Sequence, residues 1–455
     1  MTGEYKTLAR LFHADRSNDA FAHHERLARM RLEADSTFRT AIVTPLGEPF
    51  VAMPRSLSMV MERILLDENT ISALWQGIPG VMRWDYIRHA ISAEIFATNE
   101  MEGVRSTRKE VEDAVDAARA EAGGSDAAPH KRATTGRRGS SAKRRRFVEF
   151  ARLYLGLAEG SRPAENTRPA DAAGSAEGSR PAETASSRTP RTLEDIRGIY
   201  DRVTHGEVDQ DGAPDGALFR ARDVDIVGPH GDAIHTGVNG EARISVMLTQ
   251  MIDLVASDSM PGIIAAIVAH FLFEYIHPFY DGNGRTGRFL FALDLNSELS
   301  LPTVLSLSRT IAQNKEAYYK AFSQAEDRLN CGELTFFVMT MLDLIGTAQH
   351  DVIAELGVKN DRLAKAKALC DELRDEHGLS RGASEILFQV MQEQLFDSRT
   401  SVSLRDAAAQ IGLSKQSARK YVAELEDTGL IAFTGRRPLR FIASEPVRAR
   451  LDGEV

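Results

Sequence analysis

The sequence predicts an all-α protein with more than one domain. Apolar residues recur at helical spacing along most of the chain, and strand-like runs are confined to 217–240 and to the last segment. A length of 455 residues fits two or three domains, and a hydrophobic fraction of 43% suffices for ordinary cores. We therefore expect a helical bundle with a small β-hairpin, followed by a separate C-terminal domain.

Residues 1–121 are expected to form an N-terminal helical region. The pattern is helical over 57–102, Gly103 follows as a helix stop, and 104–121 predicts another helix. Three isoleucines lie four positions apart on one apolar stripe: Ile87, Ile91 and Ile95.

Two segments, 122–142 and 158–190, have the composition of disordered insertions. The first is rich in Gly, Ser and Ala, and the second is of low complexity. Such segments have too few apolar side chains to form a core. We interpret the basic stretch from Lys131 to Arg146 as a solvated linker, with contact to nucleic acid or an acidic surface as the alternative.

Residues 191–346 are expected to form the main helical domain. The apolar pattern predicts helices at 192–204, 241–256, 261–276 and 284–297, and two more within 312–346. Short strand-like runs around Gly and Pro within 217–240 predict a β-hairpin.

Residues 347–394 predict connecting helices, one of them at 358–376, and 395–455 predicts a small separate domain. Within 401–445 the order is helix, turn, helix and hairpin, with Ser414 as an N-cap of the second helix. This order is typical of a winged helix.

The winged-helix segment carries basic residues on its second helix and in its wing: Lys415, Arg419, Lys420, Arg436, Arg437 and Arg440. Duplex DNA is therefore a candidate partner. Glu424, Glu426 and Asp427 reduce the local positive charge, so a protein-interaction module is the alternative.

The bulk composition excludes several classes of protein. The two cysteines, Cys331 and Cys370, show neither a zinc-ligand spacing nor a disulfide framework. No secretory signal is visible, and the longest apolar run, 261–273, is too short to span a bilayer. With a net charge of −9, we expect a soluble, cytoplasmic protein with no membrane partner.

Residues 277–288 combine the groups that phosphate chemistry requires. An apolar helix ends at His277, whose ordinary pKa suits it to take a proton near neutral pH. Interleaved glycines and the start of the next helix predict a cradle for an anion. Arg285 and Arg288, three apart, can hold separate phosphates, and Asp281 can offer an oxygen to magnesium. The set predicts phosphoryl or nucleotidyl transfer, whereas a helix junction with surface charges is the alternative.

This string resembles the signature of the Fic family, HxFx(D/E)GN(G/K)RxxR, and matches it at every specified position. The resemblance extends over roughly 83–346, and it implies an all-α bundle with a β-hairpin flap. It also implies that His277 is the general base for a target hydroxyl and that Phe279 anchors the core. Asp281 is implied to bind Mg2+, with Asn283 beside it.

The same resemblance implies how ATP is held. The backbone from Gly282 to Arg285 is implied to form the anion hole for the α-phosphate. Arg285 is implied to contact phosphates, and Arg288 to hold the γ-phosphate. Gly284 stands where the kinase-like Doc branch of the family has lysine, which favours transfer of AMP over phosphorylation.

The implied function is that of a protein adenylyltransferase using ATP and Mg2+. Its partner is a target protein with a Ser, Thr or Tyr hydroxyl, or the chain itself. Residues 219–235 resemble the flap that holds a target segment by main-chain pairing, with an ordinary surface hairpin as the alternative. Two other functions stay open: the reverse reaction, which removes AMP, and a DNA-binding regulator whose Fic domain senses nucleotide. Formation of a homodimer also stays open.

Some residues upstream and downstream of the motif have two interpretations. Asn314, Tyr318 and Tyr319 resemble the family segment near the adenine, although aromatic pairs at helical spacing also belong to cores. His270 and Glu274 precede the motif on its first helix, and we expect them to pack against a neighbouring element.

The segment before the core matches the inhibitory motif of the family, (S/T)xxxE(G/N), at Thr98, Glu102 and Gly103. It ends the helix expected at about 83–103, and its position continues the isoleucine stripe, so Glu102 should point inward. A buried carboxylate needs a cationic partner, and Arg288 is the best candidate. The resemblance implies that this pairing blocks productive placement of ATP. A solvated glutamate at a helix end is the alternative.

Overall fold

The computed structural model describes residues 5–122, 146–160, 189–208, 212–227, 233–396 and 401–452. The chain divides into two compact units, 1–69 with 87–350 and 70–86 with 351–455. Most of the segments predicted as insertions, 122–142 and 158–190, lies outside the described residues. Residues 158–160 belong instead to a helix, Val148–Gly160.

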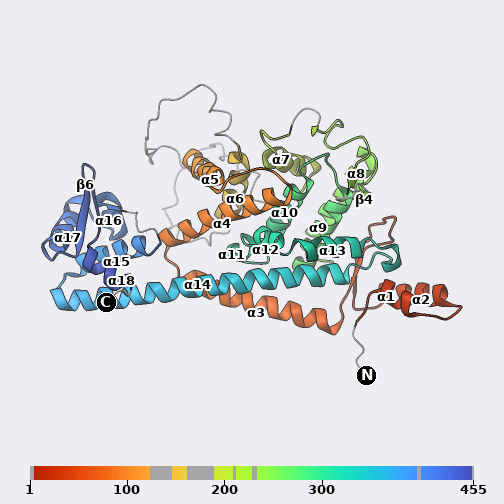
Figure 1. Cartoon of the computed structure of the whole chain (residues 1–455), viewed down its shortest axis with the longest axis horizontal. Helices are drawn as coiled ribbons and strands as arrows, with labels where there is room; N and C mark the ends of the chain where they lie inside the picture. Colours follow the sequence, from red (N-terminus) through yellow and green to blue (C-terminus); the bar gives the residue numbers. More distant parts are fainter. Residues whose placement is uncertain are drawn as a thin grey trace, which may run out of the picture. The chain divides into compact units, whose positions relative to one another are not determined.

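The first unit is almost entirely helical, which confirms the all-α prediction (Figure 1). Its elements before the hairpin are α1 Leu8–Ala14, α2 Ala20–Leu32, β1 Thr37–Arg39, β2 Phe50–Ala52, α3 Arg55–Gly77, α4 Gly80–Met101, α5 Arg108–Ala122, α6 Val148–Gly160 and α7 Leu193–Val203. The later ones are β3 Asp225–Val227, β4 Ala233–Thr236, α8 Glu241–Ala256, α9 Gly262–Ile276, α10 Asn283–Leu295, α11 Leu301–Val304, α12 Leu307–Gln313, α13 Lys315–Ala325, η4 Arg328–Asn330 and α14 Thr335–His377. Helices α3, α4 and α14 contribute residues to both units.

Helix α9 is the central helix of the first unit. All of its residues except Gly262 and Glu274 are buried. A helix that is apolar on every side must be covered, and α8 and α10 both pack against it. Because α10 also packs against α7, the loop between α9 and α10 is held at both ends by core helices.

The helix expected over 57–102 is divided into α3 and α4. Helix α3 ends at Gly77 and α4 begins at Gly80. Pro79 lies between them, and proline both lacks a backbone N–H and restricts the residue before it.

The predicted β-hairpin is present. Strands β3 and β4 are antiparallel, with Ile226 opposite His235. The ring of His235 lies 2.9 Å from a carboxylate oxygen of Glu326 and 2.8 Å from the carbonyl oxygen of Tyr275. These contacts fix β4 to the end of α9 and to the end of α13.

The second unit has the predicted order of helix, turn, helix and hairpin. Its elements after α14 are α15 Arg381–Phe396, β5 Val402–Ser403, α16 Leu404–Gln410, α17 Lys415–Asp427, β6 Ile431–Arg436, β7 Leu439–Ala443 and α18 Glu445–Asp452. The strands form one sheet in the order β5-β7-β6. Ser414 is the N-cap of α17, as predicted, because its hydroxyl accepts a bond from the Ser417 N–H.

Two boundaries in this region differ from the sequence prediction. Helix α14 is uninterrupted (Figure 1), so 358–376 is not a separate connecting helix. The core of the winged-helix segment also includes α15, from which Ile386, Leu387 and Val390 are fully buried, so it begins well before residue 395. Among the helices of the described ranges, none combines the length and apolar character needed to cross a membrane.

Candidate active site

The turn between α9 and α10 is fixed by two left-handed residues. Helix α9 ends at His277, which has a φ of 51°, and Pro278 cannot continue the helix. Gly282, with a φ of 79°, precedes Asn283, the first residue of α10. A Cβ on Gly282 would lie 2.6 Å from Cγ2 of Thr204, so conformation and space both require glycine.

The side chain of Asn283 holds this turn together. Its Oδ1 accepts a bond of 2.9 Å from the Phe279 N–H, and its Nδ2 donates one of 2.8 Å to the Phe279 carbonyl. The ring of Phe279 is fully buried and stacks on Tyr200 with a centroid distance of 3.6 Å. The resemblance placed Asn283 beside magnesium, but both polar atoms of its side chain are used inside the loop.

Arg288 is buried and bound to the end of α4. Its Nε donates a bond of 2.8 Å to the Thr98 hydroxyl, and a terminal nitrogen donates one of 2.7 Å to the Glu102 carboxylate. Burial alone lowers the pKa of Arg288, but the neighbouring charge of Glu102 raises it overall, so the guanidinium stays charged. The structure therefore brings together the two residues that the sequence paired.

The carboxylate of Glu102 lies over the first turn of α10. A Cβ added to Gly284 would overlap Oε1 of Glu102 and would lie 3.0 Å from a terminal nitrogen of Arg288. The free N–H groups at a helix N-terminus favour negative charge, so Glu102 stands where an anion is best stabilised. Gly103, with a φ of 68°, ends this segment as the predicted helix stop.

A second buried carboxylate, on Glu207, pairs with Arg285. Burial raises the pKa of Glu207 although the charge of Arg285 opposes the shift. Nε of Arg146 lies 3.4 Å from the same carboxylate, and another nitrogen of Arg146 donates a bond of 2.9 Å to the Arg105 carbonyl. Sequence reasoning missed Glu207, because a single glutamate in a loop gives no local pattern.

His277 is in a state that can accept a proton. Burial lowers the pKa of His277 to about 4, and the charges of His235 and Arg220 act in the same direction, while Asp281 opposes them. The imidazole is therefore neutral near pH 7. Its buried Nδ1 has no hydrogen-bond partner among the described residues.

Asp281 is exposed, and its Oδ1 accepts a bond of 2.7 Å from the Gly282 N–H. Within the described ranges, no group of three or more His, Cys, Asp or Glu side chains is arranged to hold a metal ion. A single exposed carboxylate fits Mg2+, which takes most of its remaining ligands from phosphates and water.

The two neighbouring tyrosines, Tyr318 and Tyr319, differ in their exposure to solvent. Tyr318 is buried, and its hydroxyl lies 2.9 Å from Nε2 of His270, as expected for a core residue. Tyr319 is 48% exposed, and Glu102 is among the charges that affect its pKa, which burial raises. Asn314 is exposed and donates to the Thr310 carbonyl. Tyr319 is therefore the better placed of the pair for a ligand.

His270 and Glu274 pack against α10, as expected. Nδ1 of His270 lies 3.2 Å from the Gly287 carbonyl. A Cβ on Gly287 would overlap the carboxylate of Glu274, so glycine permits the close approach of α9 and α10. Burial raises the pKa of Glu274 to about 8, which leaves it mostly protonated at neutral pH.

Residues 190–295 match the model of the Fic/DOC family, and they include the hairpin, α9 and α10. This chain carries a Fic/DOC domain. A segment of 62 residues is 44% identical to a probable protein adenylyltransferase of Aquifex aeolicus. The match covers 14% of this chain and 17% of that protein, so the chain spans about a sixth of the curated relative's length.

Solved structures of Fic proteins are also similar to this chain. A Fic family protein of Desulfovibrio desulfuricans is 16% identical, with 87% of this chain and 98% of that chain covered and a TM-score of 0.46. A Fic domain containing signaling protein of Bacteroides thetaiotaomicron is 15% identical, with 64% and 97% covered and a TM-score of 0.39.

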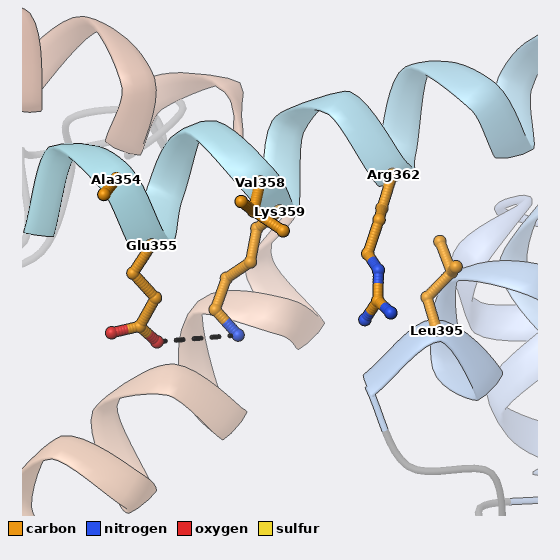
Figure 2. A pocket seen from close by; sticks show the side chains of 6 residues that line it. All are labelled: Ala354, Glu355, Val358, Lys359, Arg362 and Leu395. Atoms are coloured by element: carbon orange, nitrogen blue, oxygen red, sulfur yellow. Dashed lines mark ion pairs between the residues drawn. The ribbon is translucent and has the colours of Figure 1, made fainter.

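A hollow in the second unit contains none of the residues assigned to the Fic site. Its lining residues are Ala354, Glu355, Val358, Lys359, Arg362 and Leu395 (Figure 2). Glu355 and Lys359 form an ion pair of 3.7 Å one helical turn apart on α14.

We predict that His277 in the Fic domain titrates near pH 4 instead of at the ordinary value of 6.5, because burial penalises the charged imidazolium. The measurement is an NMR titration of the histidine ring protons, with His277→Gln identifying the signal. A midpoint at or above 6 would contradict the assigned environment.

Proposed function

We propose that this chain transfers the AMP part of ATP to a Ser, Thr or Tyr hydroxyl of a target protein, and that Glu102 inhibits this activity. One observation carries the proposal: neutral His277 and the N-terminus of α10, with buried Arg285 and Arg288, belong to one rigid turn. That turn unites a base with a site for phosphates.

The reaction uses the residues of this turn in order. His277 takes the proton of the target hydroxyl, and the oxygen forms a bond to the α-phosphorus of ATP as the bond to pyrophosphate breaks. The free N–H groups at the start of α10 and the guanidinium of Arg285 stabilise the charge that develops on the phosphates. Asp281 would hold Mg2+, which neutralises phosphate charge when bound.

Inhibition follows from the position of Glu102. Its carboxylate lies over the cradle and uses a terminal nitrogen of Arg288, while Thr98 uses the Nε of that arginine. The γ-phosphate of ATP needs the same donors. Productive binding therefore requires Glu102 to leave, and Arg288 exchanges a carboxylate for a phosphate.

The hairpin is the proposed docking site for the target. Strands β3 and β4 pair only with each other within the described residues, so each has an edge that can accept a further strand. An extended target segment added there gains main-chain hydrogen bonds.

Removal of AMP from a modified target is a second candidate activity. The position of Glu102 over the cradle favours it, because a carboxylate there can orient a water molecule. Incubating the wild-type chain with AMP-modified target and following release of AMP tests this activity separately from transfer.

His277→Ala should bind ATP but transfer AMP about 100- to 10,000-fold more slowly, since a positioned base is lost while the cradle remains. Calorimetry measures ATP binding, and α-labelled ATP measures transfer to protein in a lysate. An unchanged labelling rate would refute the role of His277 as base.

Glu102→Gly should raise AMP transfer by about 5- to 150-fold, the range of ordinary regulatory coupling free energies. Glu100→Gly is the matched control, because Glu100 is exposed and two positions away. Equal or lower labelling by a folded Glu102→Gly variant, measured with α-labelled ATP, would rule out inhibition by Glu102.

We also propose that the second unit binds duplex DNA. Lys415, Arg419 and Lys420 are exposed on α17, and Arg436 and Arg437 are exposed at the turn between β6 and β7. These are the elements with which winged helices contact phosphates. Arg440 is excluded, because its guanidinium binds Ser401.

The full chain should bind nonspecific duplex DNA with a Kd of about 1–100 µM at physiological salt, and more weakly as salt rises. A triple variant of Lys415, Arg419 and Lys420 to Ala should lose this binding, whereas Arg381→Ala, an exposed arginine of α15, should keep it. Fluorescence anisotropy of labelled DNA measures both, and no binding at low salt would favour a protein-interaction module.

A further inference from the structure

Arg220, which lies between α7 and β3, is fully buried, and within the described residues its side chain donates hydrogen bonds to backbone carbonyls alone. Its Nε donates a bond of 2.7 Å to the His277 carbonyl. One terminal nitrogen donates to Arg222 at 2.7 Å, and the other to Val238 at 2.8 Å and to Ile276 at 3.3 Å. No carboxylate in the described part of the chain forms an ion pair with it.

A buried cation of this kind is unfavourable unless its donors are needed. Burial lowers the pKa of Arg220, but a guanidinium remains charged at neutral pH. An apolar side chain of similar volume fills space at a lower desolvation cost. An arginine at this position is therefore explained by the several N–H donors of its guanidinium group.

These donors satisfy the end of α9. The last carbonyls of a helix have no partner inside the helix, and those of Ile276 and His277 are both bound by Arg220. The backbone N–H of Arg220 also donates to the Pro278 carbonyl at 3.1 Å. Arg220 thus binds three consecutive residues at the point where His277 adopts its left-handed conformation.

The same side chain joins this turn to the base of the hairpin. Arg222 precedes β3 and Val238 follows β4, so the guanidinium holds both ends of the hairpin and the end of α9. Gly237 permits this arrangement, because a Cβ there would overlap a terminal nitrogen of Arg220 and would lie 3.1 Å from Cβ of His277. The Nδ1 of the His277 ring has no hydrogen-bond partner in the described residues.

We propose that Arg220 is the positioning residue for His277: it holds the left-handed turn that aims the imidazole and couples that turn to the hairpin. This inference rests on the proposed role of His277 as the base. Because Arg220 is fully buried, its proposed role is exerted through His277 and not by contact with nucleotide or target. Its loss therefore alters the transfer step and leaves the phosphate site at the start of α10 in place.

The test uses the full chain with Glu102→Gly as the parent. Arg220→Ala should lower kcat on the order of 100-fold, because small misplacement of a reacting group is that costly, while the Kd for ATP changes less than about twofold. Millimolar guanidinium should restore part of kcat to Arg220→Ala. Arg220→Lys keeps the positive charge but lacks the planar set of N–H donors, so its kcat should lie between those of Arg220→Ala and the parent. Arg222→Ala removes an exposed side chain, and its kcat should match that of the parent.

A second measurement is independent of activity. In Arg220→Ala the NMR ring signal of His277 should shift or broaden, whereas it should stay in place in Arg222→Ala. If Arg220→Ala does not fold, the NMR ring signal of His277 is measured in Arg220→Lys instead. The inference is overturned by an unchanged His277 signal, by unchanged kcat, or by parallel loss of kcat and ATP binding without rescue. If the parent transfers no AMP, the proposed function fails, and the His277 signal still decides the role of Arg220.

Discussion

Arg288 and Glu102 are 186 positions apart in the chain, and their ion pair joins the residue after α4 to the second turn of α10. The Arg288 side chain is 2% exposed, so an unpaired charge there would be strongly unfavourable. In this structure the Glu102 carboxylate is the anionic partner of Arg288. In the proposed mechanism, Glu102 occupies the donor of Arg288 that the γ-phosphate of ATP would use, and the phosphate would replace Glu102 as the partner of Arg288.

Arg285 shows the same principle on the other side of the cradle. Its partner is Glu207, which comes from the loop after α7 and is itself held by Arg146. Both arginines of α10 are thus neutralised by carboxylates from other elements before any ligand binds. Under the proposed function, nucleotide affinity would be the difference between the free energies of these carboxylate pairings and of the phosphate pairings that replace them. Substitutions of Glu102, Glu207 or Arg146 would then alter it.

The sequence predicts the parts of this site that lie in local patterns. The apolar run and the proline locate the end of α9, and the spacing of Thr98 and Glu102 on the isoleucine stripe places them inward. It could not predict Glu207, whose ion pair with Arg285 joins residues 78 positions apart. Nor could it predict that Asn283 holds the Phe279 backbone, because a polar residue at a helix start suits a ligand equally well. The continuity of α14 was missed because a composition change does not require a helix to end.

Glu102 and Arg220 contact different parts of the proposed site. Glu102 acts on Arg288 and on the N–H groups of α10, whereas Arg220 acts on the carbonyls at the end of α9. The loop between the helices connects the two sets of contacts, and it is held by Asn283 and by the stacked ring of Phe279. Under the proposed function, release of Glu102 would admit nucleotide and would leave the contact of Arg220 with the His277 carbonyl in place. Under the same proposal, a target strand on the hairpin would act through Arg220 on the alignment of His277. Inhibition would then govern ATP binding, whereas target docking would govern the rate of transfer.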